Sequence, residues 1–390
     1  ARPGSGVRRE AQEVPPSIPA PPRRASKPAR LQTGAPPDRR ASKPARLQTG
    51  APPDRRASRP APSMVAPPVL AAAAYLGSLL IACIVSGFQQ NTPRQLEIDR
   101  GVFMIAPGVF MPLIANGISR NHSMWLASGG RHIDTAFWYG DAQQAAVGDA
   151  IAASGIPRAD LFITTKVACC PTERCSSFCD APPNPVGAST ANVTEQLEHS
   201  LALLGLEQAD LVLLHNPCSR PEDTAAAYAA LEAAHARGLA RAIGVSNLNA
   251  SALAALLEVA TLPPAVNQCS LSIAGHPAAH DGVGTTCLEG SRLYGADDAT
   301  VRFSAQRGVA LAAYSPLGSI SKVDVLGRAE VQAVARAKGK TAAQVALRWL
   351  VQQGITAVTA TSNAEHAAEA LDVFSFALTQ GEMRRLSRIR

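Results

Sequence analysis

One pattern, repeated eight times between residues 112 and 362, limits what this chain can fold into. A short apolar run ends in one or more polar residues, and a stretch with a helical apolar stripe follows it. The runs and the polar residues that end them are Pro112–Ala115 with Asn116, His132–Ile133 with Asp134, Leu161–Thr165 with Lys166, Leu211–Leu214 with His215, Ala242–Val245 with Ser246 and Asn247, Ala265–Val266 with Asn267 and Gln268, Val309–Ala313 with Tyr314 and Ser315, and Thr356–Val358 with Thr359–Ser362.

Eight strand–helix units predict an α/β fold of the (β/α)8 TIM-barrel type, spanning residues 98–390. The carboxyl ends of barrel strands share one face, so we expect the polar residues to gather there. A doubly wound sheet would need a glycine-rich phosphate turn after its first strand, which the sequence lacks. Before the first unit, two apolar runs around Pro107-Gly108 predict an N-terminal β-hairpin.

Residues 1–63 differ in composition from the rest. RRASKPARLQTGAPPD occupies Arg23–Asp38 and recurs at Arg39–Asp54, a proline- and arginine-rich sequence that predicts a disordered basic tail. This tail carries 14 Lys/Arg and 4 Asp/Glu, a net charge of +10, so a chain total of +7 leaves −3 for the remainder. The predicted barrel therefore gives no electrostatic reason to expect nucleic-acid binding.

Residues 66–88 contain the uncharged run VLAAAAYLGSLLIACIVSGF. Its length suits a transmembrane helix, and its composition also suits a signal peptide. The sequence thus predicts a membrane-associated or secretory/organellar protein, with the anchor and the cleaved signal both open, or a cytoplasmic protein if this segment is not functional. Four cysteines, Cys169, Cys170, Cys175 and Cys179, lack paired CxxC spacing, so no metal site is predicted, and disulfides and free thiols both remain open.

Three residues near the second and third predicted strands form a candidate proton-donor set. Asp134 and Tyr139 lie in RHIDTAFWYG, and Lys166 ends the next apolar run. A neighbouring ammonium would favour ionisation of the phenol, Asp134 would hold Lys166, and Tyr139 would protonate a developing alkoxide. Each residue has a structural alternative, as a helix cap, a half-buried core residue or a solvated strand end, but their order and spacing favour the functional interpretation.

Other strand-end residues suit a nicotinamide cofactor. His215 could hydrogen-bond a substrate carbonyl as a neutral imidazole. Ser246, Asn247 and Gln268 could orient a carboxamide, and Tyr314 offers a ring for stacking. The SPLGS segment, with Ser315, Leu317 and Ser319, offers hydroxyl and backbone N–H groups for phosphate oxygens. Together these residue types predict hydride transfer.

From about Arg100 onward the chain resembles the aldo-keto reductases. The motifs that carry the resemblance are MPLIANGIS, RHIDTAFWYG, DLFITTKV, DLVLLHNP, AIGVSN, VNQ, AYSPLGS and AAQVALRWLVQQGI. The resemblance implies a catalytic tetrad of Asp134, Tyr139, Lys166 and His215, with Tyr139 as the general acid and His215 beside Trp138 in the substrate pocket. It implies reduction of sugar-type or small aldehydes and ketones by a protein expected to be a monomer. The alternative is a regulatory subunit that binds nicotinamide, partners a membrane protein and turns over little.

The resemblance implies NADP(H), but the chain departs from the family near the adenosine end of the cofactor. The lysine and arginine that commonly hold the 2′-phosphate correspond to Ala360 and His366. Thr361, Ser362 and His366 remain as candidate adenosine contacts. NADP(H) is therefore the expected cofactor, with NAD(H) left open.

Overall fold

The structure, a computed structural model, describes residues 97–168, 193–218, 221–274, 297–318 and 323–389. The basic tail, the hydrophobic segment at 66–88, the Cys169–Cys179 loop and Ser319 lie outside these residues. Within the described ranges, no helix has both the length and the apolar character that crossing a membrane requires.

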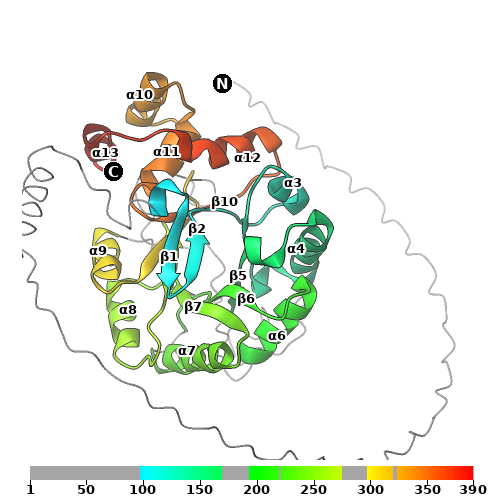
Figure 1. The fold of residues 1–390 in the computed structure, drawn as a ribbon. Coiled ribbons are helices and arrows are strands. Elements are labelled where there is room, and N and C mark those ends of the chain that lie inside the picture. The colour runs from blue at the N-terminus through cyan, green and yellow to red at the C-terminus, as the bar shows by residue number, and fades with distance from the viewer. Residues whose placement is uncertain (1–96, 169–192, 219–220, 275–296, 319–322, 390) are drawn as a thin grey trace, which may run out of the picture. The chain divides into compact units, whose positions relative to one another are not determined.

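Eight parallel strands close into a barrel in the order β10-β3-β4-β5-β6-β7-β8-β9 (Figure 1). The strands are β3 (Ile114–Asn116), β4 (His132–Asp134), β5 (Phe162–Val167), β6 (Ala209–Leu214), β7 (Ala240–Ser246), β8 (Val266–Ser270), β9 (Ala310–Tyr314) and β10 (Thr356–Thr359). Each strand overlaps one of the eight apolar runs, so the TIM-barrel prediction is confirmed. The register places Asp134 on β4 opposite Thr164 on β5, and Lys166 on β5 opposite Leu213 on β6.

The predicted hairpin is present as β1 (Val102–Ala106) and β2 (Val109–Pro112), which pair antiparallel. Its side chains Ile105, Val109 and Met111 pack in one cluster with Phe162 and Val266, which lie at the starts of their strands. The hairpin therefore covers the amino-terminal end of the barrel, where it crosses the strands in Figure 1. The carboxyl ends, where the polar residues lie, face the other way.

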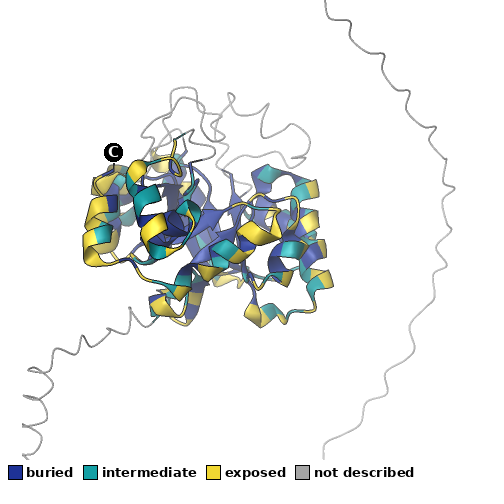
Figure 2. Ribbon diagram, turned by 90° about the horizontal axis from the view of Figure 1, so that it is seen from above, coloured by how far each residue is buried: buried dark blue, intermediate teal, exposed yellow. Residues whose placement is uncertain are grey.

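Helices surround the strands (Figure 1) and turn their buried faces inward (Figure 2). They are α3 (His122–Ala127), α4 (Asp141–Ser154), α6 (Val193–Leu204), α7 (Pro221–Ala236), α8 (Ala250–Leu257), α9 (Asp298–Gln306), α10 (Ala329–Lys338), α11 (Ala342–Val351), α12 (Ala364–Leu371) and α13 (Gln380–Leu386), with short 3-10 turns η1 (Phe137–Tyr139), η2 (Arg158–Asp160) and η4 (Asp372–Ser375).

The predicted apolar stripe of α6 is buried against the barrel: Val193, Leu197, Leu201 and Leu204 are all shielded from solvent. Helix α4 approaches α6 closely at Gly148, where a β-carbon would lie 2.5 Å from the carbonyl oxygen of Leu203. Only a residue without a β-carbon allows the two helices to approach this closely.

Candidate active site

Asp134, Lys166 and Tyr139 meet at the carboxyl end of the barrel. Lys166 is fully buried on β5, and its Nζ donates to Asp134 Oδ1 and, at 3.1 Å, to the carbonyl oxygen of Thr135. Its third neighbour is the hydroxyl oxygen of Tyr139, 3.5 Å away. The three residues predicted as a set therefore form one hydrogen-bonded group around a buried ammonium.

The pKa of Tyr139 differs from the expectation. Burial raises it above its ordinary value of 10, and although the positive charge of Lys166 lowers it, the net direction is upward. The positive charge of Lys166 alone favours a lowered pKa for the phenol, but burial removes hydration from the phenolate, and that loss outweighs the nearby charge. The phenol is consequently held in its protonated, donating form.

Lys166 remains charged in this environment. Burial lowers its pKa, but the charge of Asp134 and the hydrogen bonds to Asp134 and Tyr139 outweigh that effect, so the net shift is upward. Asp134 has a second partner, since its Oδ2 accepts a 2.8 Å hydrogen bond from Gln268 Nε2 on the opposite side of the barrel. Asp134 is thus held at both oxygens and can in turn hold Lys166 in position.

His215 directly follows β6 and is 8% exposed. Its ring centroid lies 5.8 Å from that of Tyr139, edge to face, and 5.0 Å from that of Trp138. Burial, reinforced by the charge of Lys166, lowers the pKa of His215 well below 6.5. The buried Nδ1 has no hydrogen-bond partner among the described residues. A neutral imidazole with spare hydrogen-bonding capacity therefore lies beside the phenol, next to an aromatic wall.

The predicted carboxamide residues form a neighbouring network. Ser246 Oγ donates to the carbonyl oxygen of Gln268 at 2.7 Å, and Tyr314 OH donates to Asn247 Oδ1 at 2.9 Å. Asn247 Nδ2 donates to the carbonyl oxygen of His215 at 3.0 Å, and Asn247 adopts a left-handed backbone with φ of 64°. The network ties the candidate cofactor residues to the backbone that carries His215.

The segment after β9 has features that fit a phosphate ligand. Ser315 is 7% exposed, has a positive φ of 52°, and its Oγ has no partner within the described chain. A buried hydroxyl without a partner costs free energy unless a ligand or water satisfies it. Gly318, at φ of 86°, allows the tight turn, since a β-carbon there would lie 2.0 Å from the carbonyl oxygen of Val323.

Beyond that turn lies a pocket of about 370 Å³, which we call the β10 pocket. Leu317, Thr361 and His366 line it, together with residues of α10, α11 and α12, whereas Ser362 is exposed and does not line it. Ser315 and the β10 pocket together offer places for the pyrophosphate and adenosine portions of a nicotinamide dinucleotide, so the residues present fit a cofactor of this class.

Two residues that contact the predicted group were not assigned a role from the sequence. The carbonyl oxygen of Thr135 accepts from Lys166. Asn116 Oδ1 accepts from Thr361 N at 3.0 Å, while its buried Nδ2 has no partner in the described chain. Asn116 occupies the same strand-end position as the other site residues, and that position is the signal that could have identified it.

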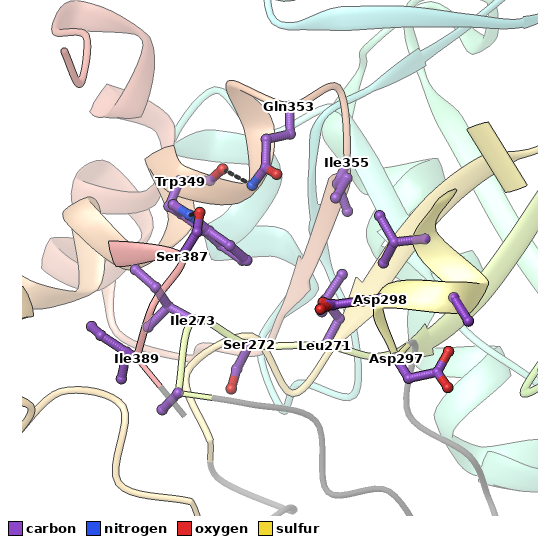
Figure 3. A pocket seen from close by; sticks show the side chains of 13 residues that line it. Leu271, Ser272, Ile273, Asp297, Asp298, Trp349, Gln353, Ile355, Ser387 and Ile389 are labelled. Atoms are coloured by element: carbon purple, nitrogen blue, oxygen red, sulfur yellow. Dashed lines mark hydrogen bonds between the residues drawn. The ribbon is translucent and has the colours of Figure 1, made fainter. Parts of the chain in front are cut away.

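A second cavity, of about 580 Å³, lies apart from this group. In Figure 3, Trp349, Gln353 and Ser387 line one side and Asp297 and Asp298 the other. Trp349 Nε1 donates to Ser387 Oγ at 3.0 Å, which joins α11 to the residue after α13. None of the proposed catalytic or cofactor residues lines this cavity. We therefore do not assign the active site to it, although it is larger than the β10 pocket.

Comparisons with known proteins agree with this geometry. An aldo-keto reductase of Mycolicibacterium smegmatis is 35% identical over 268 residues, covering 69% of this chain and 80% of the relative. A D-galacturonate reductase of Fragaria ananassa is 32% identical over 286 residues, covering 68% and 78%. The crystal structure of a Bombyx mori aldo-keto reductase in complex with NADP superimposes with a TM-score of 0.58 at 25% identity, covering 74% and 92%. The model of the Aldo/keto reductase family matches residues 122–390, and the chain belongs to that family.

Proposed function

We propose that this protein reduces aldehydes or ketones to alcohols with a nicotinamide dinucleotide as hydride donor. Membership of the family and relatives named as reductases support carbonyl reduction in general. The observation that carries the assignment to particular residues is the 3.5 Å contact between Lys166 Nζ and Tyr139 OH, beside the neutral imidazole of His215.

In this proposal the reduced nicotinamide supplies the hydride, and the protein supplies the proton and the orientation. Tyr139 OH donates its proton to the carbonyl oxygen as negative charge develops there. Lys166 lies close enough to stabilise the resulting phenolate, and Asp134 keeps Lys166 in place. His215 donates an N–H to the same carbonyl oxygen and aligns it.

The cofactor would be held by the network that surrounds these residues. Ser246, Asn247 and Gln268 would bind the carboxamide, and the ring of Tyr314 would stack on the nicotinamide. Ser315, Leu317 and Ser319 would contact the pyrophosphate, and Thr361, Ser362 and His366 the adenosine. The Ser315 hydroxyl has no partner among the described residues, and Leu317, Thr361 and His366 line the β10 pocket; both observations support this placement.

We propose small carbonyl compounds, including sugar-type aldehydes, as the substrates. Trp138 is 7% exposed and lies against His215, so one wall of the substrate pocket would be aromatic. Such a wall suits the C–H faces of a sugar as well as small aliphatic or aromatic groups. The strawberry relative named as a D-galacturonate reductase supports the inclusion of sugar acids.

The test is oxidation of NADH and NADPH, followed by absorbance, with a panel of sugar, aliphatic and aromatic aldehydes. We expect turnover that the Tyr139→Phe variant loses while it still binds coenzyme. Coenzyme binding without turnover on any member of the panel would instead favour the regulatory subunit.

A further inference from the structure

The β10 pocket is the place where this chain would distinguish its coenzymes. It lies at the carboxyl end of β10, where Thr359, Ala360 and Thr361 form one side and His366 and Glu369 of α12 form another. Leu317 and Leu347 give it apolar walls. A pocket of about 370 Å³ that combines apolar walls with neutral polar side chains suits a nucleoside.

The charges around this pocket are unfavourable for a phosphate monoester. Among the described lining residues there is no lysine and no arginine, and the one carboxylate is that of Glu369. Ala360 and His366 occupy the two positions at which the family resemblance would place cations. A further carboxylate, Glu365, lies in the first turn of α12.

Two cations close to the pocket in sequence are engaged elsewhere. Lys340, which precedes the lining residue Thr341, donates to Asp372 Oδ2 at 2.7 Å and to Ser375 Oγ at 2.9 Å. Arg348, which follows Leu347, donates to Gln352 Oε1 at 3.0 Å and to the carbonyl oxygen of Val373 at 3.2 Å. Neither can turn to a phosphate without giving up these bonds.

The amino terminus of α12 is partly occupied by the protein's own side chains, which makes it a weaker site for an anion. Helix amino termini bind phosphates through free backbone N–H groups. Here Asn363 Oδ1 accepts from the N–H groups of Glu365 and His366, at 2.7 and 3.3 Å. Thr361 Oγ1 accepts from the N–H of Asn363 at 3.1 Å. The protein's own side chains thus accept from three of the N–H groups that a phosphate would need, those of Asn363, Glu365 and His366.

From these contacts we infer that the protein uses NAD(H) in preference to NADP(H), an inference that rests on the proposed function. A 2′-phosphate carries a charge of about −2, which would lie next to Glu369 with no described cation to neutralise it. A ribose 2′-hydroxyl is neutral and can donate to a carboxylate, which is how an acidic residue selects NAD in other dinucleotide sites. His366 is a weaker phosphate partner than a guanidinium, which binds phosphate oxygens with two parallel hydrogen bonds.

The test is equilibrium titration of the full chain with NADH and with NADPH, followed by quenching of protein fluorescence and by calorimetry. We expect NADH to bind more tightly by about ten-fold or more, a ratio typical of one lost charge-assisted contact. Equal or tighter binding of NADPH would overturn this inference and leave the proposed function intact. Binding of neither coenzyme would overturn both.

A designed variant tests the cause. Ala360→Lys combined with His366→Arg places two cations at the pocket and should shift the NADPH-to-NADH affinity ratio toward NADPH by about ten-fold or more. The matched control, Ser251→Lys with Ala255→Arg, adds the same charges on exposed positions of α8, away from α12 (Figure 1), and should leave the ratio unchanged. An equal shift in both variants would show that net charge, not the pocket, sets the preference.

Discussion

Lys166 Nζ lies 3.5 Å from Tyr139 OH and 5.2 Å from the centroid of the same ring, although 27 residues separate the two in sequence. Replacing Tyr139 with phenylalanine removes the proton donor and keeps the ring that packs beside His215. We expect kcat to fall by at least about 100-fold, the usual scale for loss of a general acid. The coenzyme dissociation constant, measured by fluorescence titration, should change little. Turnover by the Tyr139→Phe variant at the wild-type rate would show that Tyr139 is not the general acid.

Replacing Asp134 with asparagine should reduce both stability and activity. The variant leaves the fully buried Lys166 without its carboxylate, and removing one member of a buried ion pair costs about 3–5 kcal/mol. Urea denaturation would measure this loss, and steady-state kinetics the accompanying fall in kcat.

Asp210→Asn is the matched control for Asp134→Asn. Asp210 is also buried and pairs with Arg158 and Arg241, but it lies near the start of β6, at the amino-terminal end of the barrel. It should destabilise the fold and leave kcat of the remaining folded enzyme near the wild-type value. An equal loss of kcat in both variants would indicate a general structural effect.

Stability should fall as the pH drops below about 6.5. His215 and His132 both have a lowered pKa, chiefly because of burial, so they stay neutral in the folded protein while the unfolded chain takes up protons. The unfolded state then binds more protons, and the free energy of unfolding falls by up to about 1.4 kcal/mol per pH unit for each histidine. Above about pH 7.5, where the unfolded histidines are also neutral, neither residue contributes to the slope. Denaturation midpoints from pH 5 to pH 8 would measure it, and His132→Asn should make it shallower.

The pH profile of activity should lack two features. Because the pKa of His215 lies well below 6.5, protonation of this residue should not reduce kcat/KM between pH 6.5 and 8. Because the pKa of Tyr139 lies above 10, its ionisation should not reduce kcat/KM for carbonyl reduction at pH 9. A fall in kcat/KM centred near pH 8 would contradict the raised pKa of Tyr139.

Replacing Trp138 with alanine should weaken substrate binding more than the chemical step. The indole packs against His215 with ring centroids 5.0 Å apart, so its removal opens one wall of the proposed substrate pocket. We expect KM for aromatic aldehydes to rise by about ten-fold, corresponding to the loss of one aromatic contact of about 1 kcal/mol or somewhat more. Trp138→Phe retains a ring and should show a smaller rise. A change confined to kcat would argue against a binding role.

The sequence alone predicts the order of the strands, because each barrel strand is a short apolar run. It also predicts which residues share the site, because the barrel topology places the carboxyl ends of all strands on one face. Asp134, Lys166, His215 and Gln268 were identified in this way. The hairpin was equally readable, since two apolar runs flank a proline–glycine turn.

Three-dimensional packing decided what those residues do to one another. Gln268 lies 134 positions from Asp134, yet donates to its carboxylate, and no local pattern encodes that contact. The direction of the shift in the Tyr139 pKa depends on the burial of the phenol, and the effect of burial outweighs that of the lysine charge that the sequence revealed. Sequence determined which groups reach the site, and burial and distance, which depend on the whole fold, decided their protonation and their partners.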